Sequence, residues 1–386
     1  MPRRGPFAVL RRALVPLVAA LALGSCARQA AIETSPPRAP TPAPIERDRL
    51  SLGAVYPGEA WSMVPTPEAA GFSSDSLDAL HAYVGGLNTT AVLVVVDGRA
   101  LFRHGPLDSL SYLASVRKSI LAMLYGNYVE DGTIDLDRTL EDLGMDDVQG
   151  LLPIEKRARV RDLVAARSGV YHPASNPGDN SADAPERGSQ EPGTYYLYNN
   201  WDFNAAGAAF ELMTGRDIYD ALQTDLAEPL AFQDFDRGRQ RKSGDTERSL
   251  NRAYHMWLST RDMARFGLLM LRDGRWRGEQ VIPADWAHRI RAVVTPLEEM
   301  NPPRLREGDH GYGYMWWVWD GPNATGAFEG AYTARGAYGQ YITVMPALGL
   351  VVAHKTAVPP EKQTEWDDYM GILTRLATAY CGTECS

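Results

Sequence analysis

The sequence lacks the residue patterns on which several common enzyme classes depend. Its seven histidines are scattered, with no H-x-H or H-E-x-x-H pairing that would suit a metal ion. There is no P-loop, no dinucleotide-binding glycine fingerprint and no G-x-S-x-G nucleophile turn. These absences argue against a metalloenzyme, a nucleotide-dependent enzyme and an α/β-hydrolase. We therefore expect neither a metal nor an organic cofactor.

Basic residues are also scarce. The chain has 39 Lys and Arg against 48 Asp and Glu, which gives a formal net charge of −9. Four of the arginines lie in the first 25 residues, which hold no acidic residue, so the remainder is still more acidic. Such a charge disfavours anionic partners, and we expect no nucleic-acid partner. Beyond the N-terminal segment, no apolar run is long enough to span a membrane.

The N-terminal segment has the pattern of an export signal. A basic start is followed by an apolar run over 13–23 that is too short for a mature membrane helix, so residues 1–25 are predicted to be a signal peptide. Leu23-Gly-Ser-Cys26 resembles the bacterial lipoprotein box, in which the cysteine becomes the lipidated first residue. An ordinary signal peptide cleaved nearby is the alternative.

Residues 26–49 are predicted to be a tether. Five prolines lie between Pro36 and Pro44, and such a stretch favours an extended, semi-rigid chain. With a lipid on Cys26, the sequence predicts a membrane-anchored protein in the periplasm of a Gram-negative bacterium, with Ala27 suggesting the outer membrane by analogy with other lipoproteins.

Ser115 and Lys118 are the first candidate catalytic pair. They lie three residues apart at the start of an apolar helical stretch, so their side chains share one helix face. A serine hydroxyl needs a neighbouring base, and Lys118 is the only one of five lysines with a serine three residues earlier. Ordinary lysine has a pKa near 10.4, so Lys118 must be buried to act at neutral pH. A helix N-cap and a solvated lysine are the alternative.

Tyr198-Asn199-Asn200 is the second candidate site. It lies between a polar, loop-like segment from His172 to Gly193 and an apolar helical stretch that begins at Trp201. A tyrosine and an amide at such a junction can point into a cleft and share protons with a serine–lysine pair. A packed tyrosine followed by an N-capping asparagine is the alternative.

Gly336 and Ala337 form the third candidate site. They precede two predicted hairpin strands, over 341–345 and 349–354. A glycine before a strand lets the backbone approach a ligand and leaves an N–H free to point at it. That N–H and the amide of Ser115 are candidates for an oxyanion hole. A glycine-rich turn without a ligand is the alternative.

In this order and spacing, the three sites resemble the serine β-lactamase and penicillin-binding protein superfamily. The closest branch is the class C β-lactamase-related esterases and nylon-oligomer hydrolases. The resemblance covers roughly residues 70–380. It extends to three further stretches: Val160–Gly169, Leu258–Gly267 and Gly311–Trp317.

The resemblance implies hydrolysis of an ester or amide bond through an acyl-enzyme on Ser115. Lys118 would be the general base and Tyr198 would pass the proton to the leaving group, although a Tyr198 phenolate stays open as the base. Asn200 would hold Lys118 and the substrate. The oxyanion and substrate-binding wall would comprise Gly336, Ala337, Tyr338 and Gln340.

Ala334 departs from the family pattern. The family's lactamases and peptidases place Lys or His there, and that cation recognises the carboxylate of a β-lactam or of a peptide terminus. Its absence disfavours a strong β-lactamase, although Arg335 can partly substitute if it points inward. A β-lactamase or D-amino-acid peptidase is therefore the first alternative function, and a covalent sensor without turnover is the second.

The predicted fold is α+β, with an antiparallel sheet flanked by helices and an inserted all-helical subdomain. We expect a hairpin over 91–103, a strand over 314–319 and a final helix over 364–380. The hydrolase domain would span 50–386, with its α/β part over about 50–125 and 305–386 and the insertion over about 126–304. Tryptophans 316, 317 and 319 are expected to pack against a helix, and a Cys381–Cys385 disulfide is plausible.

Overall fold

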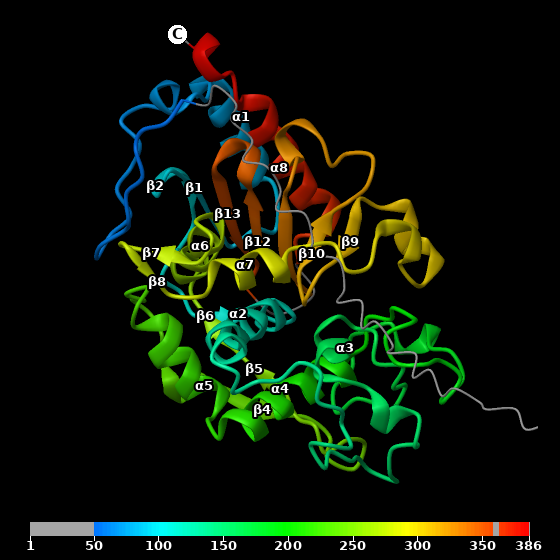
Figure 1. Cartoon of the computed structure of the whole chain (residues 1–386). Coiled ribbons are helices and arrows are strands. Elements are labelled where there is room, and N and C mark those ends of the chain that lie inside the picture. The colour runs from blue at the N-terminus through cyan, green and yellow to red at the C-terminus, as the bar shows by residue number, and fades with distance from the viewer. Residues whose placement is uncertain (1–49, 358–362, 386) are drawn as a thin grey trace, which may run out of the picture. The chain divides into compact units, whose positions relative to one another are not determined.

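Seven antiparallel strands from both ends of the described chain form the main sheet, in the order β2-β1-β13-β12-β11-β10-β9 (Figure 1). This arrangement confirms the predicted fold class. The strands are β1 Ala91–Val96, β2 Arg99–His104, β9 His310–Tyr312, β10 Trp317–Trp319, β11 Tyr332–Gly336, β12 Gln340–Met345 and β13 Leu350–Lys355.

The computed structural model describes residues 50–357 and 363–385, which all belong to the unit Thr41–Ser386. The predicted signal peptide, the lipidation site Cys26 and the tether lie outside the described residues. Within the described part of the chain, no helix combines the length and apolar character needed to cross a bilayer.

The hairpin β1–β2 forms as predicted. Its turn residues Asp97 and Gly98 have φ values of 51° and 86°, and positive φ at both positions is typical of a tight two-residue turn. The second hairpin, β12–β13, turns through Pro346–Leu348 and Gly349, whose φ is 60°. Both strand pairs follow from β-rich runs separated by turn-forming residues.

The strand predicted over 314–319 is wrong in its first half. The chain instead makes a hairpin in which β9 ends at Tyr312 and β10 begins at Trp317, and these two residues face one another across the pair. Met315 lies in the turn with a φ of 60°. Gly313 is the single turn-forming residue among 313–316, and the largely aromatic run over 314–317 hides the turn.

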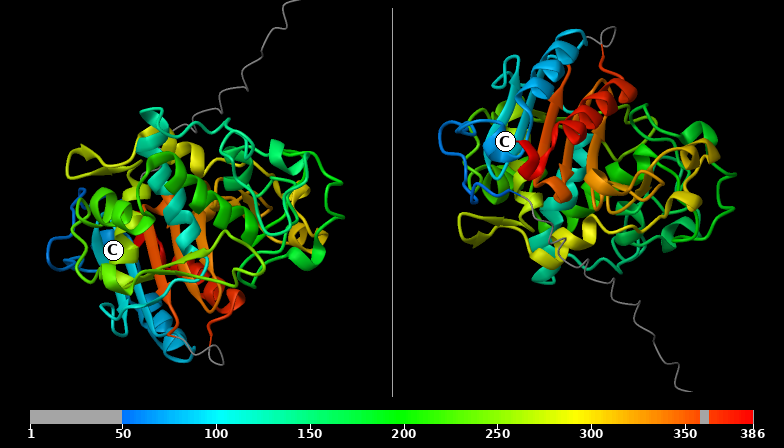
Figure 2. Two further views of the ribbon diagram at one scale, coloured as in Figure 1. Left: turned by 90° about the horizontal axis from the view of Figure 1, so that it is seen from below. Right: turned by 90° about the horizontal axis from the view of Figure 1, so that it is seen from above.

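Helices cover both faces of the sheet. On one face, α1 (Ser74–Gly85) and α8 (Trp366–Ala379) lie side by side and bury the even-numbered valines of β1 (Figure 2, right). On the other face, α6 (Thr260–Leu271) packs against β1, β12 and β13. The final helix is confirmed, and α6 covers the sheet although it lies within the span predicted as the insertion.

Helix α2 (Val116–Glu130) leads away from Ser115 and is buried against the sheet strands β11 and β12 and two further helices, α4 (Asn200–Thr214) and α7 (Ala284–Ile290). Cys381 and Cys385 form a disulfide with Cα atoms 5.2 Å apart. The other helices are α3 Val160–Val164 and α5 Ile218–Ala221. Three small ribbons pair β3 Ser111–Tyr112 with β6 Trp257–Leu258, β4 Arg241–Ser243 with β5 Ala253–His255, and β7 Arg275–Trp276 with β8 Glu279–Gln280.

Candidate active site

Ser115 stands at the start of α2 and lines a cleft of about 480 Å³. It occupies the N-cap position, but its side chain makes no capping hydrogen bond, so the hydroxyl is not committed to the helix. The residue before it, Ala114, has a φ of 47°. A non-glycine residue in the left-handed region is strained, and such strain is common where a backbone presents a reactive group.

Lys118 lies one turn into α2 and is only 1% exposed. Its Nζ donates hydrogen bonds of 2.7 Å to Tyr198 Oη and 2.7 Å to Asn200 Oδ1. The same nitrogen lies 4.2 Å and 4.3 Å from the ring centres of Tyr198 and Phe203. Burial, followed by the positive charge of Arg117, lowers the pKa of Lys118 well below its ordinary value. The solvated-lysine alternative is therefore wrong.

Tyr198 precedes α4 and contacts both members of the pair. Burial raises the pKa of Tyr198 to about 12, although the neighbouring Ser115 hydroxyl and the charges of Arg117 and Arg335 act to lower it. The Tyr198 phenol is therefore a weaker acid than a free tyrosine, while the Lys118 ammonium is a stronger acid than a free lysine. The sequence leaves both Lys118 and Tyr198 open as the base, and the directions of these two pKa shifts favour Lys118.

Asn200 is the first residue of α4 and holds Lys118 through a hydrogen bond, while two further hydrogen bonds fix Asn200 itself. Its Oδ1 accepts the bond from Lys118, its Nδ2 donates to the Pro177 carbonyl at 2.9 Å, and its backbone N–H donates to Asp179 Oδ2 at 2.7 Å. It is buried and does not line the cleft. This placement favours holding Lys118 over direct contact with substrate.

Gly336 brings the end of β11 against the backbone of the nucleophile. A Cβ at this position would lie 2.5 Å from the Leu113 carbonyl oxygen and 3.1 Å from the Ser115 nitrogen, so only glycine fits without displacement. The amides of Ser115 and Ala337 donate no hydrogen bond within residues 50–357 and 363–385. Two free N–H groups beside one hydroxyl suit an oxyanion.

Tyr338 and Gln340 have different positions in the turn that follows Gly336. Tyr338 lines the cleft with a φ of 64°. Gln340 is fully buried, and its Nε2 donates to the carbonyls of Tyr338 (2.8 Å) and Thr356 (2.7 Å). Gln340 therefore fixes the turn from inside and is not part of the cleft lining.

Arg335 and two tryptophans form the wall of the cleft beside this turn. The Arg335 guanidinium lies 4.8 Å from the Trp317 ring centre and 3.7 Å from that of Trp366. All three residues line the cleft, and no acidic side chain in the described chain pairs with Arg335. The Arg335 side chain therefore has the inward orientation that the sequence left open. Trp316 and Trp319 are buried, whereas Trp317 lines the cleft, so the expected packing against a helix does not describe all three.

Asp179 and Trp366 are cleft residues that the sequence did not single out. Asp179 lies in the loop between His172 and Gly193, which has no periodic pattern, and Trp366 begins the final helix. Only the position of that loop just before Tyr198 indicated that it would border the site. Other residues that line the cleft are Gly178, Asn180, Leu305, Tyr341, Gln363, Thr364 and Glu365.

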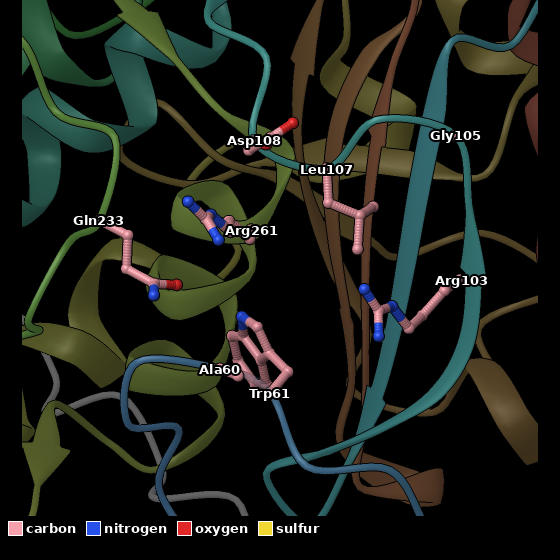
Figure 3. Close-up of a pocket in the computed structure, with 8 residues that line it drawn as sticks. All are labelled: Ala60, Trp61, Arg103, Gly105, Leu107, Asp108, Gln233 and Arg261. Atoms are coloured by element: carbon pink, nitrogen blue, oxygen red, sulfur yellow. The ribbon is translucent and has the colours of Figure 1, made fainter.

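A second cavity of about 290 Å³ shares no residue with the cleft (Figure 3). Trp61, Arg103, Gln233 and Arg261 surround it from separate segments. The guanidinium of Arg261 is already engaged with the Asp234 carboxylate through bonds of 2.6 Å and 2.5 Å. No lysine, serine or tyrosine of the described chain lines this cavity, so it lacks the residue types that come together in the cleft at Ser115.

Solved structures share this fold at low sequence identity. A protein of Bacillus anthracis assigned as a 6-aminohexanoate-dimer hydrolase has 18% identity and a TM-score of 0.58, with 86% of this chain and 88% of that chain covered. EstCE1, a hydrolase with promiscuous acyltransferase activity, has 16% identity and a TM-score of 0.57, with coverage of 80% and 98%. A penicillin-binding protein homologue from Caulobacter crescentus has 14% identity and a TM-score of 0.55, with coverage of 80% and 97%.

The sequence itself matches the profile of the family described as Beta-lactamase over residues 78–372. The matched region contains the cleft and its three motifs, from Ser115 to Ala337. Because the match spans most of the chain, the protein belongs to the beta-lactamase family.

Proposed function

We propose that this protein is a serine hydrolase that cleaves an ester or amide bond through an acyl-enzyme on Ser115. The observation that carries the proposal is the contact of the buried Lys118 amine with Tyr198, beside a serine hydroxyl that opens into a cleft. Lys118, whose burial favours the neutral amine, accepts the serine proton, with Tyr198 in contact with both groups.

The reaction then follows from the positions of the surrounding groups. The Ser115 oxygen attacks the substrate carbonyl, and the amides of Ser115 and Ala337 bind the oxyanion that forms. Tyr198 delivers its proton to the departing alcohol or amine as the bond between the carbonyl carbon and that group breaks, and takes up the serine proton from Lys118 in its place. Lys118 then deprotonates a water molecule that attacks the acyl-enzyme, and the same proton passes to the Ser115 oxygen as the acid leaves.

A second candidate function is hydrolysis of β-lactams or of D-amino-acid peptides. Arg335 supports it, because a guanidinium in the cleft wall that pairs with no acidic side chain of the described residues suits a substrate carboxylate. The family cation is still missing at Ala334, which is buried. We therefore rank this activity below ester or amide hydrolysis, and a covalent sensor that stays acylated below both.

We also propose that the enzyme works in the periplasm, anchored through a lipid on Cys26. The signal-like segment over 1–25 and the proline-rich stretch after it support this location. Expression of the full chain and of Cys26→Ser tests the anchor. We expect the first to sediment with membranes and the second to be released, and equal sedimentation of both would exclude a lipid on Cys26.

The test of the activity is intact-protein mass after incubation with p-nitrophenyl butyrate, benzylpenicillin and nitrocefin, with absorbance for turnover. We expect ester turnover with no lasting β-lactam adduct, and no turnover by Ser115→Ala. Hydrolysis that survives in Ser115→Ala would contradict the proposed nucleophile. A persistent penicilloyl adduct would indicate a penicillin-binding protein, and rapid nitrocefin hydrolysis a β-lactamase.

A further inference from the structure

Arg117, the neighbour of Lys118 in α2, is a buried cation with very few partners. It is 2% exposed, and its guanidinium lies 4.4 Å from the ring centre of Tyr254. Its single side-chain hydrogen bond runs from Nη2 to Asn204 Oδ1 at 3.3 Å, while Nε and Nη1 have no acceptor among the described residues. A buried charge normally has a counter-charge, so this arrangement needs a reason.

Helix α4 provides one asparagine acceptor for each of Arg117 and Lys118. Asn204 accepts from Arg117 and Asn200, one turn earlier, accepts from Lys118. Both asparagines then donate through Nδ2 to one loop, Asn204 to Asn176 Oδ1 at 2.9 Å and Asn200 to the Pro177 carbonyl at 2.9 Å. The two cations are thus fixed side by side, with neutral amides in place of carboxylates.

The same loop supplies a negative charge on the cleft side. Asp179 is half-buried and lines the cleft. Its Oδ2 accepts from the Asn200 backbone N–H at 2.7 Å and its Oδ1 from that of Ser181 at 3.1 Å, so the carboxylate is held in place. The next residue, Asn180, donates its N–H to the Tyr198 carbonyl at 2.9 Å.

We propose that Arg117 and Asp179 are positioning residues that act on Lys118 with opposite sign, the guanidinium favouring the neutral amine and the carboxylate favouring the ammonium. The inference rests on the proposed role of Lys118 as the base. It assigns a function to Arg117, which the sequence marks only as one of the two residues between Ser115 and Lys118.

The charges around Lys118 agree with this assignment. After burial, Arg117 is the main group that lowers the pKa of Lys118, and Asp179 is the carboxylate that raises it. Arg117 and Asp179 act with the same opposite signs on the pKa of Tyr198. The titratable and charged groups that face Arg117, Lys118 and Tyr198 from neighbouring elements are Tyr112, Asp179, Tyr196, Tyr219, Tyr254, His255, Tyr312 and Arg335.

The test is the pH dependence of Ser115 modification by a fluorophosphonate, followed by intact-protein mass, because it needs no natural substrate. The acid limb of this rate reports the protonation of the base. We expect Arg117→Met to move the limb up by about 1 pH unit and Asp179→Asn to move it down by a similar amount. The double variant should return close to the wild-type profile.

Two matched variants separate charge from structural damage. Arg117→Lys keeps a cation and should keep the wild-type limb. Arg265→Met removes another fully buried arginine, on α6, and should lower the melting temperature without moving the limb. If Arg117→Met does not fold, the direction in which Asp179→Asn shifts the acid limb still tests the inference.

If the acid limb stays at the wild-type pH in both single variants, or moves in the same direction in both, this inference is overturned. The proposed function is not affected by that result. A folded wild-type protein that the fluorophosphonate does not label at Ser115 would overturn the proposed function, and this inference with it.

Discussion

Two lysines of this protein are equally buried but have neighbours of different chemistry. Lys118 is 1% exposed and Lys355, at the end of β13, is 2% exposed. Lys118 donates to a phenol and an amide, whereas Lys355 donates to the backbone carbonyls of Ser111 and Leu258. Burial lowers the pKa of both, in the case of Lys355 to about 7.

The difference shows that burial alone does not make a base. A phenol can take up and return a proton, but a backbone carbonyl can only accept a hydrogen bond. Lys355 also lies outside the cleft lining, where no substrate reaches it. Its two carbonyls belong to the β3–β6 ribbon that leads to the nucleophile, so its role is to join that ribbon to the main sheet.

Lys118→Met tests the catalytic side of this comparison and should have the largest effect. Loss of the base should reduce the rate of Ser115 acylation by about 10²–10⁴-fold. The change removes a buried amine, so the protein should still fold. The rate of Ser115 acylation is measured by stopped flow or by mass, and circular dichroism checks the fold. Near-normal acylation would show that Lys118 is not the base.

Tyr198→Phe should have the next largest effect, because it leaves Lys118 with only an amide partner. Lys118 would then, like Lys355, donate only to groups that cannot take up and return a proton. We expect acylation to fall by about 10²-fold. The lost hydroxyl is the group that contacts both Lys118 and Ser115. Tyr196→Phe is the matched control, since its buried hydroxyl has no hydrogen-bond partner among the described residues and does not line the cleft.

Lys355→Met should affect acylation far less than Lys118→Met and should instead change how stability depends on pH. Between about pH 7 and pH 10 the unfolded chain binds a proton on Lys355 that the folded protein has lost, so this group makes stability rise with pH. The variant should lose up to about 1.4 kcal/mol per pH unit of that slope. Urea denaturation at several pH values measures it, and equal slopes would show that Lys355 does not titrate in this range.

Local patterns predicted much of the fold and the motifs of the cleft. The Asp97–Gly98 turn, the hairpin around Pro346 and the final amphipathic helix each carry their own signal. Ser115, Lys118 and Tyr198 followed from spacing and order, which a family preserves because the chemistry requires them.

Features that depend on long-range packing could not be predicted. The turn at Met315 is marked only by Gly313, and the left-handed Ala114 looks like any other alanine. Arg117 is charged, and charged side chains are usually exposed, so nothing in the sequence indicates its burial. Asp179 acquires its place only when the loop folds back onto α4.

The loop from Asn176 to Asn180 has a consequence for how such an enzyme can diversify. Gly178, Asp179 and Asn180 border the cleft, while the same loop holds Asn200 by its side chain and Tyr198 by its carbonyl. A mutation that reshapes this border to admit a new substrate also disturbs the groups that move protons. Under the proposed mechanism, selectivity and turnover are therefore coupled traits at this loop, and also at Trp317, whose ring centre lies 5.5 Å from that of Tyr198.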